Sequence, residues 1–504
     1  MFLHLCSISA NLFFCCEKMA TKQNAKVAEN NDQVEIRVPL LEKAKVAFED
    51  DFVVKYRSGK NKGHQWILYL TTFVTVCGSF AFGSCIGFSS PIQSAITEDL
   101  NLTIAQFSLF GSILNFGAMI GAITSGRMAD FTGRKGAMRV ASSFCTAGWL
   151  AIYFAEGPLP LNFGRLATGF GMGVYSYVIP VFIAEIAPKH LRGALTTTSQ
   201  LMIICGISFS FIVGTVITWR TLALTGIIPC AVLLLGLLII PESPRWLAKY
   251  GDHGKFLMAL QRLRGKEADI SDEAAEIEDY IRKLEKLPQS KLMDLFQRRY
   301  LRSIIIGVGL MFTQQLGGIN GVCFYVRDVF ESAGFPSDTG TIIYACLQVA
   351  VTALGALVID RAGRKPLLLV SASGLVVGCI LTGLSFYLKT YEIALNVIPA
   401  LAVSGILVYI GSFSIGMGAV PWVIMSEIFP LDIKGSAGSL ATLANWSTSW
   451  AVSYTFNFLI SWSSYGTYII YGTINAISIL FIILVVPETK GKTLEEIQTA
   501  INAS

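Results

Sequence analysis

Asp130-Phe-Thr-Gly-Arg-Lys135 in the first half of the chain returns in the second half as Asp360-Arg-Ala-Gly-Arg-Lys365. Two further motifs repeat in the same order. Glu185-Ile-Ala-Pro188 returns as Glu427-Ile-Phe-Pro430, and Pro241-Glu242 returns as Pro487-Glu488. The offsets between the copies are 230, 242 and 246 residues. The chain therefore consists of two related halves, and each charged motif stands between long apolar stretches.

The composition is that of a membrane protein. Of the 504 residues, 53% are hydrophobic and only 14% are charged, whereas a soluble domain carries about 25% charged residues. The net charge of +5 is small and gives no reason to expect a nucleic-acid partner. The eleven cysteines show no metal-ligand spacing, and most fall in apolar runs as small core residues. We therefore expect the lipid bilayer to surround most of the chain.

The membrane spans are marked by the absence of charge. About 20 apolar residues suffice to cross the hydrocarbon core, and lipid permits only helices or closed barrels. Because the uncharged runs are long and show no strict alternation, they predict helices. The prediction is an all-α membrane protein with twelve transmembrane helices in two pseudo-symmetric six-helix bundles, 66–241 and 302–487. The twelve predicted helices are 66–90, 104–126, 136–155, 160–182, 193–215, 221–240, 302–325, 341–359, 366–387, 396–425, 435–459 and 466–486.

Lys and Arg gather in the short loops on one side of these helices, and the positive-inside rule assigns that side to the cytosol. Both termini are then cytosolic, as a tail over 1–65 and a shorter tail over 488–504. The polar insertion 242–301 joins the halves on the same side. Its apolar residues recur at helical spacing over 271–287, which predicts short amphipathic helices lying on the cytosolic side.

Two short motifs concern the two sides of the membrane. Leu40 and Leu41, which follow Glu35 in the N-terminal tail, form a candidate dileucine signal for sorting adaptors; ordinary tail sequence is an equally good interpretation. On the opposite side, Asn101-Leu-Thr103 in the first loop matches the acceptor sequence for N-linked glycosylation.

The apolar spans contain several amide side chains. A carboxamide both donates and accepts hydrogen bonds, as each hydroxyl of a sugar does. Amides that converge on a cavity therefore suit a neutral polyhydroxylated ligand. The competing interpretation is hydrogen bonding between helices, worth about 0.6 kcal/mol per pair in membranes. It is the better one for a single amide, whereas six in one chain favour a cavity. The six are Gln200, Gln314, Gln315, Asn320, Gln348 and Asn445.

Gln314-Gln-Leu-Gly-Gly-Ile-Asn320-Gly321 places three glycines beside three amides. Adjacent glutamines lie about 100° apart on a regular helix, so both face one cavity only if the helix unwinds. Glycine permits such a break, and unwound backbone is tolerated in a membrane where it lines a cavity. Trp422 follows Pro421 in a second glycine-rich helix. It can offer a sugar ring its aromatic face and its indole N–H; packing is its alternative role.

These motifs resemble those of the sugar porters of the major facilitator superfamily over roughly 66–498, from Gly126-Arg-Met-Ala-Asp130 through Pro241-Glu-Ser-Pro-Arg245 to Pro487-Glu-Thr-Lys490. Val76-Cys-Gly-Ser-Phe-Ala-Phe-Gly-Ser84 resembles the plant early-dehydration-response monosaccharide transporter branch. The resemblance implies transport of a monosaccharide, a hexose such as glucose or fructose, by alternating access. It also implies that the sugar is held by Gln200, Gln314, Gln315, Asn320, Trp422 and Asn445. Gln348 is the seventh candidate: it stands where the family frequently has asparagine, and it keeps the amide but is longer by one methylene.

The resemblance further implies a gate of charged residues on the cytosolic side. Pairs between the bundles would hold this side shut, and because each partly exposed pair contributes about 1 kcal/mol or less, several are needed. Fixing the topology is the alternative role for the bases. The gate residues are Asp130, Arg134, Glu185, Arg192, Glu242 and Arg245 in the first half, and Asp360, Arg364, Glu427, Lys434 and Glu488 in the second.

Proton-coupled members of that family carry an aspartate on helix one, where this chain has Cys85. Intramembrane ionisable groups mark proton relays, and Arg165 lacks an evident acidic partner, so we expect facilitated diffusion. A proton-coupled symporter or antiporter and a transporter-like sugar sensor are the alternatives. We expect no enzyme, cofactor or metal, because the sequence has no catalytic cluster or phosphate-binding glycine loop. A monomeric transport unit in the vacuolar or plasma membrane is the expected form.

Overall fold

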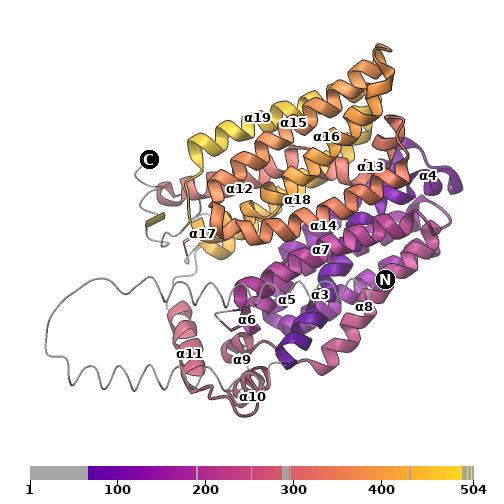
Figure 1. Ribbon diagram of the computed structural model, residues 1–504. Helices are drawn as coiled ribbons and strands as arrows, with labels where there is room; N and C mark the ends of the chain where they lie inside the picture. Colours follow the sequence, from indigo (N-terminus) through magenta and orange to yellow (C-terminus); the bar gives the residue numbers. More distant parts are fainter. Residues whose placement is uncertain are drawn as a thin grey trace.

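The computed structural model describes residues 66–188, 191–250, 253–285, 295, 297–430, 433–490, 496, 497 and 501. Throughout these residues the secondary structure is helical, without a strand. The helices form two groups that lie side by side, one from each half of the chain (Figure 1). The prediction of an all-α membrane fold is confirmed. The candidate dileucine residues Leu40 and Leu41 lie outside the described residues.

The first half consists of α3 (Trp66–Gly87), α4 (Ser89–Asp99), α5 (Ile104–Tyr153), α6 (Pro158–Ile186), α7 (Arg192–Gly214) and α8 (Trp219–Ile239). With 50 residues, α5 is about 75 Å long, more than twice the hydrocarbon thickness of about 30 Å. It bends at Gly133, whose φ of 80° and ψ of 168° are readily adopted only by glycine. Its two arms are therefore two spans, as predicted.

The second half consists of α12 (Arg298–Leu316), α13 (Ile319–Ser332), α14 (Ser337–Ala362), α15 (Arg364–Thr390), η3 (Leu395–Val397), α16 (Ile398–Ser412), η4 (Phe413–Met417), α17 (Val420–Ile428), α18 (Lys434–Trp462) and α19 (Ser464–Val485). Two of its spans are interrupted. The first breaks at Gly317 and Gly318, between α12 and α13, which confirms the break predicted there. The second passes through the π-helix η4 before α17 begins.

Nine segments of the described chain are long and apolar enough to cross a membrane. The bend makes α5 two spans, and the interrupted pair α12–α13 and the helix α18 supply two more. This brings the number to the twelve that were predicted. The helix α4 was not predicted, because its mixed polar sequence resembles a loop; it extends helix one by 11 residues.

The polar insertion folds into α9 (Pro244–Tyr250), α10 (His253–Arg264) and α11 (Ser271–Glu285). These helices share a small core of Leu247, Phe256, Leu260 and Ile277. Arg264 pairs with Glu273 at 2.7 Å and donates to the carbonyl of Ile186 at the end of α6, at 2.9 Å. The predicted amphipathic helix is confirmed over α11. The hydrogen bond from Arg264 to Ile186 connects α9, α10 and α11 to the first bundle.

The two halves contact each other through α5 on α18, α7 on α14, and α13 on α4, and α4 and α13 adjoin at one end of the molecule (Figure 1). There the backbone N–H of Arg327 donates to Ser90 Oγ at 3.2 Å. The charged motifs lie toward the opposite end, beside α9 and α17 (Figure 1). Each ion pair that the structure describes joins two residues of the same half or two residues of the polar insertion. The two halves are thus in contact at the α4–α13 end. At the opposite end, no ion pair among the described residues joins them.

Candidate functional site

Four amides form one chain of hydrogen bonds inside the second bundle. Gln314 Nε2 donates to the carbonyl oxygens of Met417 at 2.6 Å and Gly418 at 3.1 Å. Asn445 Nδ2 donates to Gln314 Oε1 at 2.8 Å, and Gln315 Nε2 donates to Asn445 Oδ1 at 3.3 Å. Asn320 Nδ2 completes the chain, donating to Gln315 Oε1 and to Ser449 Oγ. The chain therefore links α12, α13 and α18 to the interruption before α17.

The sequence explains why Met417 offers its carbonyl to Gln314. In a continuous helix this carbonyl would accept a bond from the residue four positions later, which is Pro421. Proline has no backbone N–H, so the carbonyl would be left unpaired in a buried place, at a cost of about 1–3 kcal/mol. Gln314, whose side chain is buried, supplies the missing donor.

The break between α12 and α13 brings the amides together. Gly318 has a left-handed φ of 100°, and a Cβ there would lie 2.7 Å from the ring of Tyr471. The carbonyl of Gly317, at the break, accepts hydrogen bonds from side chains of two other helices: from Tyr409 Oη at 2.9 Å and from Asn475 Nδ2 at 3.2 Å. Neighbouring helices thus support the break. It allows Gln314, Gln315 and Asn320 to join one network of hydrogen bonds.

The other three predicted site residues lie outside this chain of amides. Gln348 on α14 is buried, and its Oε1 has no hydrogen-bond partner. Gln200 on α7 and Trp422 on α17 are half-buried. The orphaned oxygen of Gln348 is an acceptor that a ligand hydroxyl can satisfy.

Sequence reasoning missed Asn115 and gave no separate role to Trp446. Asn115 on α5 donates across the halves to Ser453 Oγ at 2.9 Å and to the Ser449 carbonyl at 3.3 Å. An amide in an uncharged run was the signal that could have found it.

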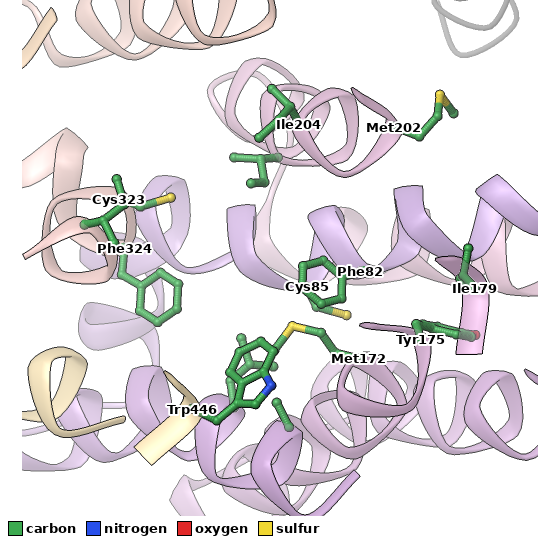
Figure 2. Close-up of a cluster of buried hydrophobic side chains, with 14 of the residues drawn as sticks. Phe82, Cys85, Met172, Tyr175, Ile179, Met202, Ile204, Cys323, Phe324 and Trp446 are labelled. Carbon is green, nitrogen blue, oxygen red and sulfur yellow. The ribbon is translucent and has the colours of Figure 1, made fainter. Parts of the chain in front are cut away.

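Trp446 on α18 and Phe82 on α3 converge in the buried cluster between the halves (Figure 2), with 6.2 Å between ring centroids. The indole N–H of Trp446 is buried without a partner.

Arg165 on α6 is fully buried, yet it forms no ion pair with any residue that the structure describes. Its guanidinium donates to the Cys85 carbonyl at 2.7 Å and to Ser89 Oγ. It also lies over the rings of Phe110 and Phe88, at 5.0 and 5.7 Å from their centroids. Carbonyl, hydroxyl and aromatic faces stabilise the charge here in place of a carboxylate.

In the first half, three charged motifs meet where α5 bends. Arg134 holds Glu185 through two bonds of 2.8 and 3.0 Å and pairs with Asp130 at 3.0 Å. Glu242 accepts the N–H of Lys135, at 3.1 Å, at the start of the second arm of α5. A Cβ on Gly133 would lie 2.6 Å from Glu242 Oε2. Burial raises the pKa of Glu242, although the N–H groups of Ser243 and Lys135 oppose the rise.

The second half repeats this arrangement. Arg364 pairs with Glu427 at 3.1 Å, and Glu488 accepts the N–H groups of Arg364 and Lys365 at 3.1 and 3.0 Å. Gly363, with a φ of 92°, adjoins Glu488 as Gly133 adjoins Glu242. Burial opposes ionisation of Glu488, but backbone N–H groups, that of Lys490 foremost, outweigh it and hold its pKa below the ordinary value. In both halves, the glutamate of the Pro-Glu motif, Glu242 or Glu488, therefore caps the helix segment that begins at the Gly-Arg-Lys motif.

These pairs lie inside each half, whereas the sequence prediction placed them between the halves. The reason is that each arginine reaches an acid on an adjacent helix of its own bundle. Arg192 is half-buried and its Nε has no partner. The guanidinium of Arg245 lies 5.5 Å from the ring centroid of Tyr280. The side chains of Asp360 and Lys434 lie outside the described part of the chain.

The family model described as "Sugar (and other) transporter" matches residues 70–501. Sugar transporter ERD6-like 7 of Arabidopsis thaliana is 65% identical over 462 residues, which cover 92% of this chain and 100% of the relative. Sugar transporter ERD6-like 16 of the same plant is 57% identical, covering 92% of this chain and 96% of the relative.

Solved structures of similar fold include the inward-open conformation of the xylose transporter XylE from E. coli. It has a TM-score of 0.72 and 26% identity, over 86% of this chain and 99% of the other. The proton:xylose symporter XylE bound to 6-bromo-6-deoxy-D-glucose has a TM-score of 0.71 and 27% identity, over 86% and 98%.

Proposed function

Because this chain belongs to the sugar transporter family of the major facilitator superfamily, in its ERD6-like branch, it transports a monosaccharide across a membrane, and we propose that it does so by facilitated diffusion. The family is one of transporters and not a class of enzymes, and we propose no catalysis. The proposed cargo is a hexose such as glucose or fructose.

The sugar site proposed is the chain of amides and the residues around it. Gln314, Gln315, Asn320 and Asn445 are hydrogen-bonded to one another, so a hydroxylated ligand would exchange these bonds for its own. Gln348 and Trp446 add an unpaired acceptor and an unpaired donor, both buried. Gln200 and Trp422 would complete the site from α7 and α17. The single observation that supports this site best is the continuous amide chain across the α12–α13 break.

The proposed mechanism is alternating access by two bundles, 66–241 and 302–487. The α4–α13 end is closed by contacts between the halves, and no described ion pair joins them at the other end. This arrangement supports an inward-facing state, in which the end bearing the charged motifs is open. The capped bends at Gly133 and Gly363 would keep each bundle rigid while the two move. The gate residues Arg192 and Arg245 would be available to acids of the second half when that end closes.

Facilitated diffusion is proposed because of Arg165. A proton-coupled carrier needs a group that gains and loses a proton within the membrane, and the guanidinium of Arg165 has carbonyl, hydroxyl and aromatic neighbours in place of a carboxylate. Proton coupling is the second candidate, because the similar XylE is a proton:xylose symporter. A sugar sensor that binds without net flux is a third.

Purified protein in sealed liposomes separates these candidates. Radiolabelled hexose should equilibrate across the membrane, and an imposed pH gradient should leave the final internal concentration unchanged. Accumulation driven by the gradient would establish coupling instead, and binding without flux would indicate a sensor. Competition by other hexoses, pentoses and polyols then identifies the preferred sugar.

Both termini are proposed to face the cytosol, because Lys and Arg concentrate on that side of the spans. The vacuolar or plasma membrane is the proposed location, and Leu40 and Leu41 are proposed to bind sorting adaptors. The transport unit is proposed to be one chain, since each half supplies its own part of the site and gate.

A further inference from the structure

Asn115 on α5 is buried where this helix packs against α18 of the other half. Its side-chain amide donates to Ser453 Oγ at 2.9 Å and to the carbonyl oxygen of Ser449 at 3.3 Å. Ser453 Oγ donates to the same carbonyl at 2.8 Å. The three groups form a closed triangle of hydrogen bonds, with one corner in the first half and two in the second. Because a buried amide that loses its partners is unfavourable, this triangle holds α5 against α18.

Ser449 also belongs to the chain of amides. Its hydroxyl accepts from Asn320 Nδ2 at 2.6 Å, whereas its carbonyl accepts from Asn115. Asn320 in turn donates to Gln315 Oε1. One buried serine is therefore bonded through its side chain to the proposed sugar site and through its backbone to the first half. A ligand hydroxyl that competes for Asn320 would act on the same residue that Asn115 holds.

The triangle lies in the part of the contact nearer the α4–α13 end. Along α5, Asn115 is closer to Ile104, where the helix begins, than to the bend at Gly133. Closer still to that end, Asn457 Nδ2 of α18 donates to Ser108 Oγ of α5 at 3.1 Å. These bonds join neutral groups of different halves. They must separate for the α4–α13 end to open, and they can do so without leaving a charge unpaired.

We propose that Asn115 is a positioning residue for transport: it holds the α4–α13 end shut, and sugar binding at Asn320 releases it through Ser449. This inference deepens the transport function and the orientation proposed above, on which it rests. Loss of the Asn115 bonds shifts the carrier toward the state in which the α4–α13 end is open. Apparent affinity scales with the fraction of carriers in the binding-competent state. Sugar on the non-cytosolic side then binds more tightly and sugar on the cytosolic side more weakly.

A cysteine in place of Ser108 measures this opening without any sugar flux. Ser108 is buried in the α5–α18 contact, so a membrane-impermeant maleimide should modify Ser108→Cys from the non-cytosolic side only while that end is open. Adding Asn115→Ala should speed the labelling about tenfold, because two neutral hydrogen bonds are lost. Adding Ser112→Ala should leave it unchanged, because buried Ser112 donates to Leu109 of its own helix, at 3.2 Å. The chain without Ser108→Cys gives the background from native cysteines.

D-glucose tests the connection to the sugar site. It should speed the labelling of Ser108→Cys, and it should have little further effect once Asn115→Ala is present. Ser453→Ala removes one corner of the triangle and leaves the bond from Asn115 to Ser449. It should therefore speed the labelling by less than Asn115→Ala does, and it should add little when the two are combined. If Asn115→Ala does not fold, as judged by thermal unfolding in detergent, Ser453→Ala is judged by the same criteria.

Uptake of radiolabelled D-glucose by sealed vesicles of both orientations separates this role from a general structural one. For Asn115→Ala, the half-saturating concentration should fall about threefold to tenfold on the non-cytosolic side and should not fall on the cytosolic side. A merely structural residue would lower the maximal rate equally on both sides. Labelling that Asn115→Ala leaves unchanged, or that Ser112→Ala raises as much, overturns the proposal. Faster labelling in Asn115→Ala while no chain moves glucose supports the role of Asn115 and counts against glucose as cargo.

Discussion

Asn445 on α18 donates a hydrogen bond to Gln314 on α12, with 2.8 Å between Asn445 Nδ2 and Gln314 Oε1. Gln314 in turn donates to the carbonyl that Pro421 leaves unpaired. One amide therefore connects the α12–α13 break, the α17 interruption and α18. If sugar binds at Gln314 as proposed and draws its amide away, the Met417 carbonyl would need another donor. Binding would then be coupled to a change in the helix that carries Trp422.

Gln314→Ala should lower hexose uptake by about tenfold or more at equal protein level. The substitution removes the donor and the acceptor that the proposed site offers the sugar at this position, each worth about 1 kcal/mol, and 1.4 kcal/mol corresponds to a factor of ten. Uptake is measured against sugar concentration. Gln261→Ala is the matched control, because Gln261 also donates to two backbone carbonyls, at 2.6 and 2.8 Å, but in α10. Equal sugar affinity in both variants would remove Gln314 from the site.

Gly133→Ala should destabilise the protein and slow transport. A non-glycine residue at this φ and ψ costs about 1–3 kcal/mol, and the new Cβ would lie 2.6 Å from Glu242 Oε2. Thermal unfolding in detergent and initial uptake rates measure the two effects. Gly438→Ala in α18 is the control, since its Cβ would meet nothing within 4 Å. If Gly133→Ala unfolds at the same temperature as Gly438→Ala, the capped bend does not support the bundle.

Glu242 and Glu488 occupy equivalent places but should respond oppositely to pH. The pKa of Glu488 is lowered in the folded state, so its stabilising contribution is present above the unfolded value of about 4.3 and disappears as pH falls through the lowered pKa. The pKa of Glu242 is raised by burial, so the folded state gains stability as pH falls through that raised pKa.

Thermal unfolding of Glu488→Gln and Glu242→Gln, followed from pH 7 downward, tests this difference. Glu488→Gln should unfold at a lower temperature than the wild type at pH 7, and the gap should close in acid. At pH 7, the decrease in unfolding temperature should be smaller for Glu242→Gln than for Glu488→Gln, because the neutral amide at position 242 avoids the cost of burying a charge. The same loss in both variants at every pH would contradict the assigned shifts.

The fold could be predicted from the sequence where a single physical rule applied. Charge-free runs located the spans, and the glycines at 317 and 318 located the break in helix seven. Which side chains form hydrogen bonds or ion pairs with one another across different helices could not be predicted. That Gln314 would bond to Met417 depends on Pro421 and on the π-helix η4. That Arg134 would take Glu185 of its own half depends on helix packing. Asn115 carried the same signal as the six amides, but only packing shows that it bridges the halves.

Cys85→Asp should introduce proton coupling into the carrier, which we propose to be passive in the wild type. The carbonyl of Cys85 already accepts from Arg165 at 2.7 Å, so a carboxylate at this position lies within reach of the guanidinium and can form the ion pair that Arg165 lacks. Protonation would break that pair, giving a group that titrates inside the membrane. An inward gradient of one pH unit supplies about 1.4 kcal/mol, which allows up to about tenfold accumulation of hexose in liposomes.

Cys85→Asn is the matched control, because it has nearly the shape of Asp and cannot titrate. Its uptake should equilibrate without accumulation at any gradient, like that of the wild type. If the wild type accumulates hexose under the gradient, a carboxylate beside Arg165 is not required for coupling and the facilitated mode is wrong. If only Cys85→Asp accumulates it, the charge partner of Arg165 decides between a passive and a driven carrier.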